Sequence, residues 1–293
     1  MTIERYTVEH ETRYDYRAAV AQSWQLAHLT PRTLPWQTVL GHRLLIEPTP
    51  DERRDEFDSF GNVATHFSLH TAHRRLRVRM NCAVEVGERP LADAVNAPAW
   101  EGVRDALRTN AAQDGLLPAL MTAPTRLVPT SEAASVYAAP SFRRGRPWLE
   151  AVSDLMHRVY EDFEFKPGST TVSTLVDEVL YQRRGVCQDF AHLMLSCLRG
   201  HGLPARYMSG YLLTDPPPGR PRLLGADASH AWVAAYAPEH GWVEFDPTND
   251  RLADQRYITL AWGSDFEDAV PLRGVLLGGR GQRMHVGVSV IPV

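Results

Sequence analysis

Residues 1–90 alternate between hydrophobic and polar positions in several short runs, as half-buried β-strands do. The clearest run lies in the segment TAHRRLRVRMNCAVEV, where every second position is hydrophobic: Leu76, Val78, Met80, Cys82 and Val84. The turn-forming stretch DSFGN separates two such runs. We therefore predict a small β-rich N-terminal domain over residues 1–90.

Residues 91–146 are rich in Ala, Pro and Thr and break the alternation. The segment PAWEGVRDALRTN predicts one short helix, and the prolines that follow it favour an extended connection over the surface. We therefore interpret residues 91–146 as a linker with a short helix.

Residues 147–293 change to a helical pattern and then return to strands. The segments WLEAVSDLMHRVYEDF, TLVDEVLYQRRG and CQDFAHLMLSCLR predict helices, and ARYMSGYLL, SHAWVAAYA, GWVEFDPT and the tail MHVGVSVIPV predict strands. Helices followed by antiparallel strands indicate an α+β domain, which we expect to carry the chemistry of the chain.

The composition excludes several classes of protein. Hydrophobic residues make up 44% and the net charge is −4, which favours a globular protein without a nucleic-acid or membrane partner. We found no apolar leader and no membrane-spanning run, and so expect a soluble, cytoplasmic protein.

The three cysteines form no CxxC pair, and Cys187 and Cys197 would lie about 15 Å apart on one helix, beyond the roughly 7 Å limit for a disulfide. We expect no metal and no cofactor.

Cys187 begins the predicted helix directly after the turn residue Gly185. On a helical wheel it shares the hydrophobic arc, as a small core residue would, whereas His192 projects to the polar side about 140° away. A thiol at a helix N-terminus also faces unpaired N–H groups, which favour the thiolate. Asp189, in the same first turn, is expected to complement the helix dipole. Cys187 by itself remains either a core residue or a nucleophile.

His230 and Asp246 are the better partners for a nucleophilic Cys187. They lie on two predicted strands joined by a short turn, on the same side of the sheet and roughly 5–8 Å apart at Cβ. An imidazole oriented by a carboxylate is what a cysteine nucleophile requires as its base. Trp232 and Trp242 share that face; they would either exclude water from the site or belong to the core.

Several blocks of this half resemble the bacterial transglutaminase-like superfamily, and more narrowly its branch described as cysteine proteases. The blocks are GVCQDFAHL, GLPARYMSGYL, ASHAWV and WVEFDPTN, and residues 1–90 resemble the β-rich region that precedes the core in this branch. The resemblance implies a papain-like core in which the helix bearing the cysteine packs on an antiparallel sheet. It further implies a thioester acyl-enzyme on Cys187, with His230 and Asp246 as the other catalytic residues.

The acyl donor implied by the resemblance is a peptide or another amide, and the acceptor is water or an amine, with hydrolysis favoured. The backbone N–H of Cys187 would hold the oxyanion, and Tyr181 or Gln182 is a candidate for the second donor. Trp232 is expected to contact the substrate.

Two alternatives stay open: a non-catalytic binding module on the same fold, and an acyltransferase that uses a thioester donor. The oligomeric state is also open, with a homo-oligomer as one alternative.

Overall fold

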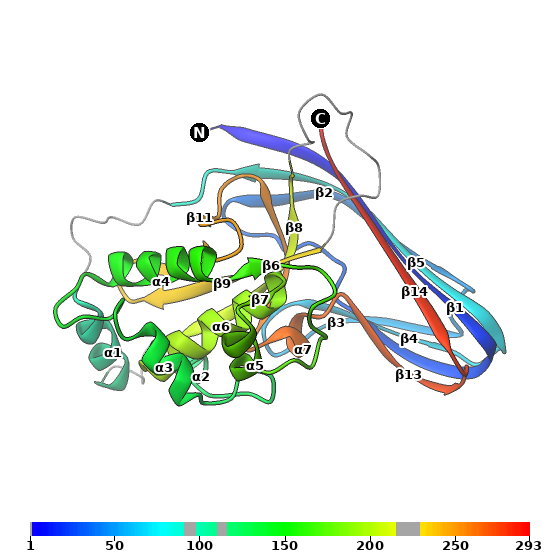
Figure 1. Ribbon diagram of the computed structural model, residues 1–293. Helices are drawn as coiled ribbons and strands as arrows, with labels where there is room; N and C mark the ends of the chain where they lie inside the picture. The colour runs from blue at the N-terminus through cyan, green and yellow to red at the C-terminus, as the bar shows by residue number, and fades with distance from the viewer. Residues whose placement is uncertain (1, 91–97, 110–115, 215–228) are drawn as a thin grey trace, which may run out of the picture.

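The computed structural model describes the chain except for residues 1, 91–97, 110–115 and 215–228. It consists of a long curled sheet, a shorter sheet and a layer of helices that packs on the shorter sheet (Figure 1). The predicted α+β class and the β-rich N-terminal region are confirmed.

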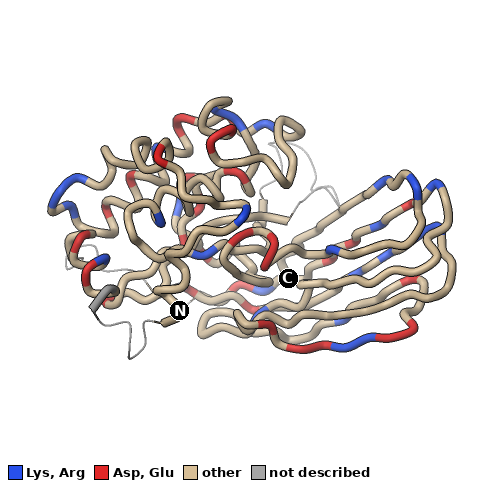
Figure 2. Tube along the Cα trace, turned by 90° about the horizontal axis from the view of Figure 1, so that it is seen from below, with Lys and Arg blue, Asp and Glu red and all other residues tan. Residues whose placement is uncertain are grey.

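The long sheet is built around β1 (Ile3–Ala27). Four N-terminal strands join it, namely β2 (Gln37–Glu47), β3 (Glu52–Phe57), β4 (Val63–Leu69) and β5 (His73–Gly87), in the order β2-β5-β1-β4-β3. β5 buries alternate side chains along its length, as its sequence pattern predicts. Figure 2 shows acidic and basic residues interleaved along this sheet, where ion pairs such as Arg77–Glu11 at 3.0 Å join neighbouring strands.

The C-terminal tail belongs to this same sheet. β13 (Leu272–Gly278) and β14 (Gln282–Pro292) both pair antiparallel with β1, at its second and first half respectively. Figure 1 shows β14 running beside β1. The tail is therefore a strand, as predicted, but its assignment to a core of residues 147–293 is corrected, because the last two strands complete the N-terminal sheet.

The predicted linker carries more structure than expected. The described part of residues 91–146 holds α1 (Trp100–Thr109), which matches the predicted short helix, and also α2 (Leu116–Leu120) and α3 (Glu132–Ala138). Ser131 caps α3 by accepting a hydrogen bond from the Ala134 N–H at 3.0 Å. Because α3 packs on α6 (Cys187–Gly200), this segment contributes to the helical layer and is not only a surface connection.

The shorter sheet contains the three strands predicted after residue 203 and two strands that were not predicted, at Arg251–Leu252 and Tyr257–Gly263. β8 (Ala205–Leu212), β9 (Ser229–Ala237), β10 (Gly241–Asp246), β11 (Arg251–Leu252) and β12 (Tyr257–Gly263) are ordered β11-β10-β9-β8-β12 and pair antiparallel.

The helices of this half are α4 (Trp148–Asp162), α5 (Val176–Gln182), α6 (Cys187–Gly200) and the short α7 (Phe266–Ala269). The two-residue strands β6 (Glu164–Phe165) and β7 (Arg184–Gly185) pair in parallel just before α6. α6 packs against β8 and β9, so the helix that begins at the cysteine lies on the antiparallel sheet, as expected.

The predicted polar side of α6 is buried as well, which corrects the expectation of an amphipathic helix. Asp189, His192, Ser196 and Arg199 are all 9% exposed or less. Each finds a partner from a distant segment; Arg199, for example, donates to the carbonyl oxygens of Met121 at 3.0 Å and Ala205 at 2.8 Å. Buried polar groups persist where such partners exist, so α6 is the central helix of its layer.

The two sheets meet through buried polar contacts. The Gln37 side chain donates to the Thr259 carbonyl and accepts from the Thr259 N–H, both at 2.8 Å, and thereby extends the edge of β12. His10 of β1 bonds the Tyr211 hydroxyl of β8 at 2.8 Å. These contacts join the N-terminal sheet to β8 and β12, the last two strands in the order of the shorter sheet.

Candidate active site

A tight turn presents Cys187 at the start of α6. α5 ends with Arg183 in the left-handed region at φ 53°, and the chain then passes through β7 into Val186, the N-cap of α6. The Asp189 carboxylate accepts from the Val186 N–H at 2.7 Å and from the Thr170 hydroxyl at 2.6 Å. Asp189 therefore does more than complement the helix dipole, because it ties the turn that carries the thiol.

Gly185 is required at this turn. A Cβ on Gly185 would come within 2.8 Å of both Cβ and Oδ2 of Asp189, closer than real Cβ contacts allow. Burial raises the pKa of Asp189, although its hydrogen bonds oppose the rise. The half-buried Cys187 therefore follows a turn in which Gly185 and Asp189 are closely packed.

The pairing of β9 with β10 brings His230 and Asp246 together. Val233 pairs with Phe245, so continuing the register places Asp246 diagonally from His230. His230 Nε2 donates to Asp246 Oδ2 at 2.7 Å, and Asp246 is fully buried. The Cys187 side chain interacts with the His230 ring as well, and since Nε2 is taken by Asp246, Nδ1 is left for the thiol. The structure therefore places the three predicted residues in one cluster.

Asp246 has three further hydrogen-bond donors. The Tyr257 hydroxyl and the Asn249 amide donate to Oδ2 at 2.6 and 2.7 Å, and the Thr248 N–H donates to Oδ1 at 2.9 Å. Sequence reasoning missed Tyr257 and Asn249. Asn249 lies three residues after Asp246 in a turn, where side-chain bonds of this kind are common, but nothing near Tyr257 in the sequence points to the site.

These contacts decide the charge of the pair. Burial alone lowers the pKa of His230, but Asp246 and Cys187 outweigh it and raise that pKa to about 10. Burial raises the pKa of Asp246, but His230, Tyr257 and Asn249 more than offset it, and the pKa is lowered from its usual value. The imidazole is therefore protonated and the carboxylate ionised at neutral pH.

The predicted substrate contact by Trp232 is wrong. Its side chain is fully buried, its indole N–H donates to Glu244 Oε2 at 2.8 Å, and its ring stacks on the His230 ring with centroids 6.0 Å apart. Trp232 supports the imidazole from the core and has no surface to offer a substrate. Tyr181 is 91% exposed, and Gln182 donates to Glu178 at 2.7 Å, so their role at the oxyanion stays a prediction.

His192 lies away from Cys187, as its angle on the helix predicts, but it is buried. Its Nε2 accepts the Phe266 N–H at 3.2 Å, and burial lowers its pKa to about 4. A buried, neutral imidazole that accepts a backbone hydrogen bond from α7 serves the packing of α6.

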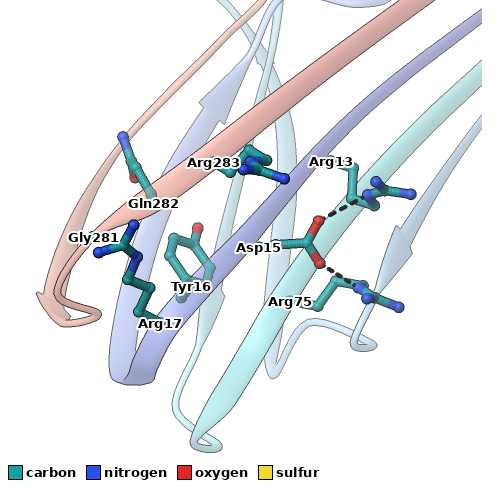
Figure 3. Close-up of a pocket in the computed structure, with 8 residues that line it drawn as sticks. All are labelled: Arg13, Asp15, Tyr16, Arg17, Arg75, Gly281, Gln282 and Arg283. Carbon is teal, nitrogen blue, oxygen red and sulfur yellow. Dashed lines mark hydrogen bonds and ion pairs between the residues drawn. The ribbon is translucent and has the colours of Figure 1, made fainter.

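Two of the cavities formed by the described residues lie away from the cluster. One, shown in Figure 3, has a volume of about 600 Å³ and is formed by arginine-rich parts of β1, β5 and β14, where Arg13 and Arg75 both bind Asp15. The other, about 660 Å³, lies where the two sheets meet. Neither is lined by Cys187, His230 or Asp246.

Within the described ranges, no three His, Cys, Asp or Glu side chains are grouped in a way that could hold a metal ion. In the same part of the chain, no helix combines the length and apolar character required to cross a membrane.

Comparison with known proteins matches both halves of the chain. The model of the bacterial transglutaminase-like N-terminal region matches residues 6–85, and the model of the transglutaminase-like superfamily matches residues 137–247. The second range contains the whole Cys187, His230 and Asp246 cluster.

Full-length relatives occur in mycobacteria. The uncharacterized protein Rv2569c of Mycobacterium tuberculosis is 42% identical over 296 residues, covering 98% of this chain and 93% of its own.

A protein-glutamine gamma-glutamyltransferase of Pseudomonas aeruginosa is 36% identical over 129 residues, covering 41% of this chain and 19% of its own. The crystal structure of a putative cysteine protease from Cytophaga hutchinsonii has the same fold, with a TM-score of 0.76 at 18% identity, covering 99% of this chain and 92% of that one.

Proposed function

Because this chain belongs to the transglutaminase-like superfamily, we propose that it is a cysteine-dependent enzyme that transfers the acyl group of a peptide or another amide through a thioester on Cys187. The observation that carries the proposal is the buried His230–Asp246 pair at 2.7 Å, whose imidazole also interacts with Cys187. A thiol, a base and an orienting carboxylate in this order are the minimal set for nucleophilic catalysis by cysteine.

In the proposed acylation step, the Cys187 thiolate attacks the amide carbonyl carbon. The oxyanion accepts a hydrogen bond from the Cys187 backbone N–H, one of the unpaired donors at the start of α6. His230 gives its proton to the departing nitrogen, the C–N bond breaks, and an amine or ammonia leaves. The acyl group remains on sulfur as a thioester, and Asp246 keeps the imidazole in place throughout.

In the proposed deacylation step, neutral His230 takes a proton from the acceptor as the acceptor attacks the thioester. With water as the acceptor the products are a carboxylic acid and the free thiol, and with an amine the product is a new amide. We favour water, because it requires no binding site of its own, whereas an amine must be positioned. The similarity to a gamma-glutamyltransferase over 129 residues makes transamidation the second candidate.

The test is a screen of glutamine-containing and other peptides, with and without hydroxylamine as an added amine. Free carboxylate as the main product supports hydrolysis, and hydroxamate as the main product supports transamidation. Cys187→Ser should lower either rate by about 10³-fold or more, because the chemistry depends on the thiol. A turnover that Cys187→Ser keeps at the wild-type rate would refute the proposal. Turnover of thioester donors alone, or partner capture without turnover, would favour the acyltransferase or the binding module.

A further inference from the structure

The cavity where the two sheets meet lies at the other end of the strands that carry the candidate active site. Its volume is about 660 Å³, and its main walls are Trp36 and Arg89 from the N-terminal part and Arg206, Trp242, Glu244 and Trp262 from the shorter sheet. This volume is in the range of about 300–1,000 Å³ found for small-molecule sites.

The strand register places two charged residues of the cavity wall on one face of the shorter sheet. Ala234 of β9 pairs with Arg206 of β8 on one side and with Glu244 of β10 on the other, so the three side chains stand in one row on the same face. Ala234, which is fully buried, separates the two charged residues by the width of one strand.

Arg206 is the unusual member of this row. Arg206 is 5% exposed, and its buried Nε donates no hydrogen bond to any described residue. It is held between the rings of Trp242 and Trp262, with 4.3 and 3.7 Å from its central carbon to the ring centroids. Burial lowers the pKa of Arg206 to about 9, which still leaves it charged at pH 7. An unpaired donor on a buried cation is costly unless a group accepts a hydrogen bond from it.

Three carboxylates line the cavity, and two of them, Glu88 and Asp254, bond Thr2 and Arg256 respectively. Glu244 is the only carboxylate in the row, and its Oε2 is shared between the Trp232 indole N–H at 2.8 Å and Arg89 Nη2 at 3.4 Å. Arg89 also donates to the carbonyl oxygens of Asp254 and Tyr257. Two buried guanidinium groups therefore face one buried carboxylate.

We propose that this cavity binds a small organic carboxylate with a flat, apolar body. A carboxylate presents two acceptors in the plane that a guanidinium fork matches, and it would accept from the Arg206 Nε that has no partner among the described residues. The edges of three tryptophans provide the apolar walls. A cationic ligand is disfavoured, because the Arg206 guanidinium already lies over the rings of Trp242 and Trp262. A dianion such as phosphate would add a second negative charge next to Glu244.

The test compares 4-fluorophenylacetate with its neutral amide, 4-fluorophenylacetamide, by ¹⁹F NMR titration of the full chain. We expect the carboxylate to bind at least about tenfold more tightly than the amide, because a charge-assisted pair contributes more than a neutral hydrogen bond. Arg206→Met should weaken carboxylate binding at least about tenfold and leave the unfolding midpoint equal or higher, since it removes a buried unpaired charge.

Two control variants make the test specific. Arg283→Met alters the arginine-rich cavity of Figure 3 and should leave binding unchanged. Cys187→Ala should also leave it unchanged, so the result is independent of the proposed enzymatic function. Absence of carboxylate binding at millimolar concentration, equal binding of the amide, or equal binding to folded Arg206→Met would each overturn the proposal.

Discussion

Asp246→Asn should convert His230 from a protonated to a neutral side chain at pH 7. The substitution keeps the size of the side chain and an oxygen for the Thr248 N–H, but it removes the charge that holds the imidazolium. In the native protein Asp246 and Cys187 raise the pKa of His230 to about 10 against the effect of burial. Without Asp246, burial becomes the dominant influence, and the His230 pKa should fall below its ordinary value of 6.5.

The size of the effect follows from the same values. A rise from 6.5 to about 10 corresponds to roughly 5 kcal/mol in favour of the charged imidazole. Part of this comes from Cys187, so we expect Asp246→Asn to cost about 3–5 kcal/mol of unfolding free energy, as for other broken buried pairs.

The pH dependence of this loss has a definite sign. The His230 pKa is raised on folding, so its contribution is complete below pH 6.5 and is lost as the pH rises toward 10. The Asp246 pKa is lowered, so its contribution is present above about pH 4 and is lost as the pH falls further. The stability difference between the native protein and Asp246→Asn should therefore be largest between about pH 4 and pH 6.5.

The assay is a ¹H–¹³C NMR titration of histidine-labelled protein, with His230 assigned from the signal missing in His230→Gln. The matched control is Asp250→Asn, which removes a carboxylate 2.7 Å from the exposed His157 and should change the titration of His157 alone. The reasoning would be refuted if native His230 titrated near pH 6.5, or if Asp246→Asn left its titration unchanged.

Two further substitutions test the supports of the site. Tyr257→Phe removes one donor to the buried Asp246 carboxylate and should lower the unfolding free energy by about 1.5–3 kcal/mol in urea titrations; an unchanged midpoint would mean that the hydroxyl contributes nothing there. Gly185→Ala drives a methyl group into Asp189 and should cost about 1–3 kcal/mol and slow alkylation of the neighbouring thiol. The control Gly102→Ala, where a Cβ meets nothing within 4 Å in α1, should instead stabilise the protein by about 0.5–1 kcal/mol; equal effects of the two alanines would disprove the close contact at Gly185.

The alternation of hydrophobic and polar positions predicted the strands well but not their partners. β14 was expected as a strand, yet its pairing with β1 joins residues near opposite ends of the chain. A period of two shows that one face of a strand is buried, and it carries no information about which sheet supplies the neighbour. For that reason the tail was placed with residues 147–293.

The helical wheel of α6 was misleading for a related reason. The wheel assumes that polar residues face water, whereas Asp189 and Arg199 are buried with partners from Thr170, Met121 and Ala205. Such partners are supplied by the fold, so no local pattern shows them.

The cluster itself was more accessible to sequence reasoning. Helix position, the side-chain period of two along the strands and the resemblance together predicted that Cys187, His230 and Asp246 would meet. Nothing in the sequence determines where the Trp232 side chain lies. A tryptophan two residues after the candidate histidine can pack beneath the imidazole or line a substrate site, and the sequence is the same in both cases. Tyr257 was missed because it reaches Asp246 from β12, across the sheet.

The most direct measurement of the central claim is the alkylation of the folded protein by iodoacetamide between about pH 5 and pH 9, with the modified cysteine mapped by mass spectrometry. Cys82 and Cys197 are free but buried, and burial raises both of their pKa values, so they serve as internal controls. We predict that Cys187 reacts far faster than either, stays reactive well below pH 8, and changes its pH profile in His230→Ala. If Cys187 reacted no faster than a free thiol and its profile were the same without His230, the thiolate–imidazolium pair, and with it the enzymatic function, would be contradicted.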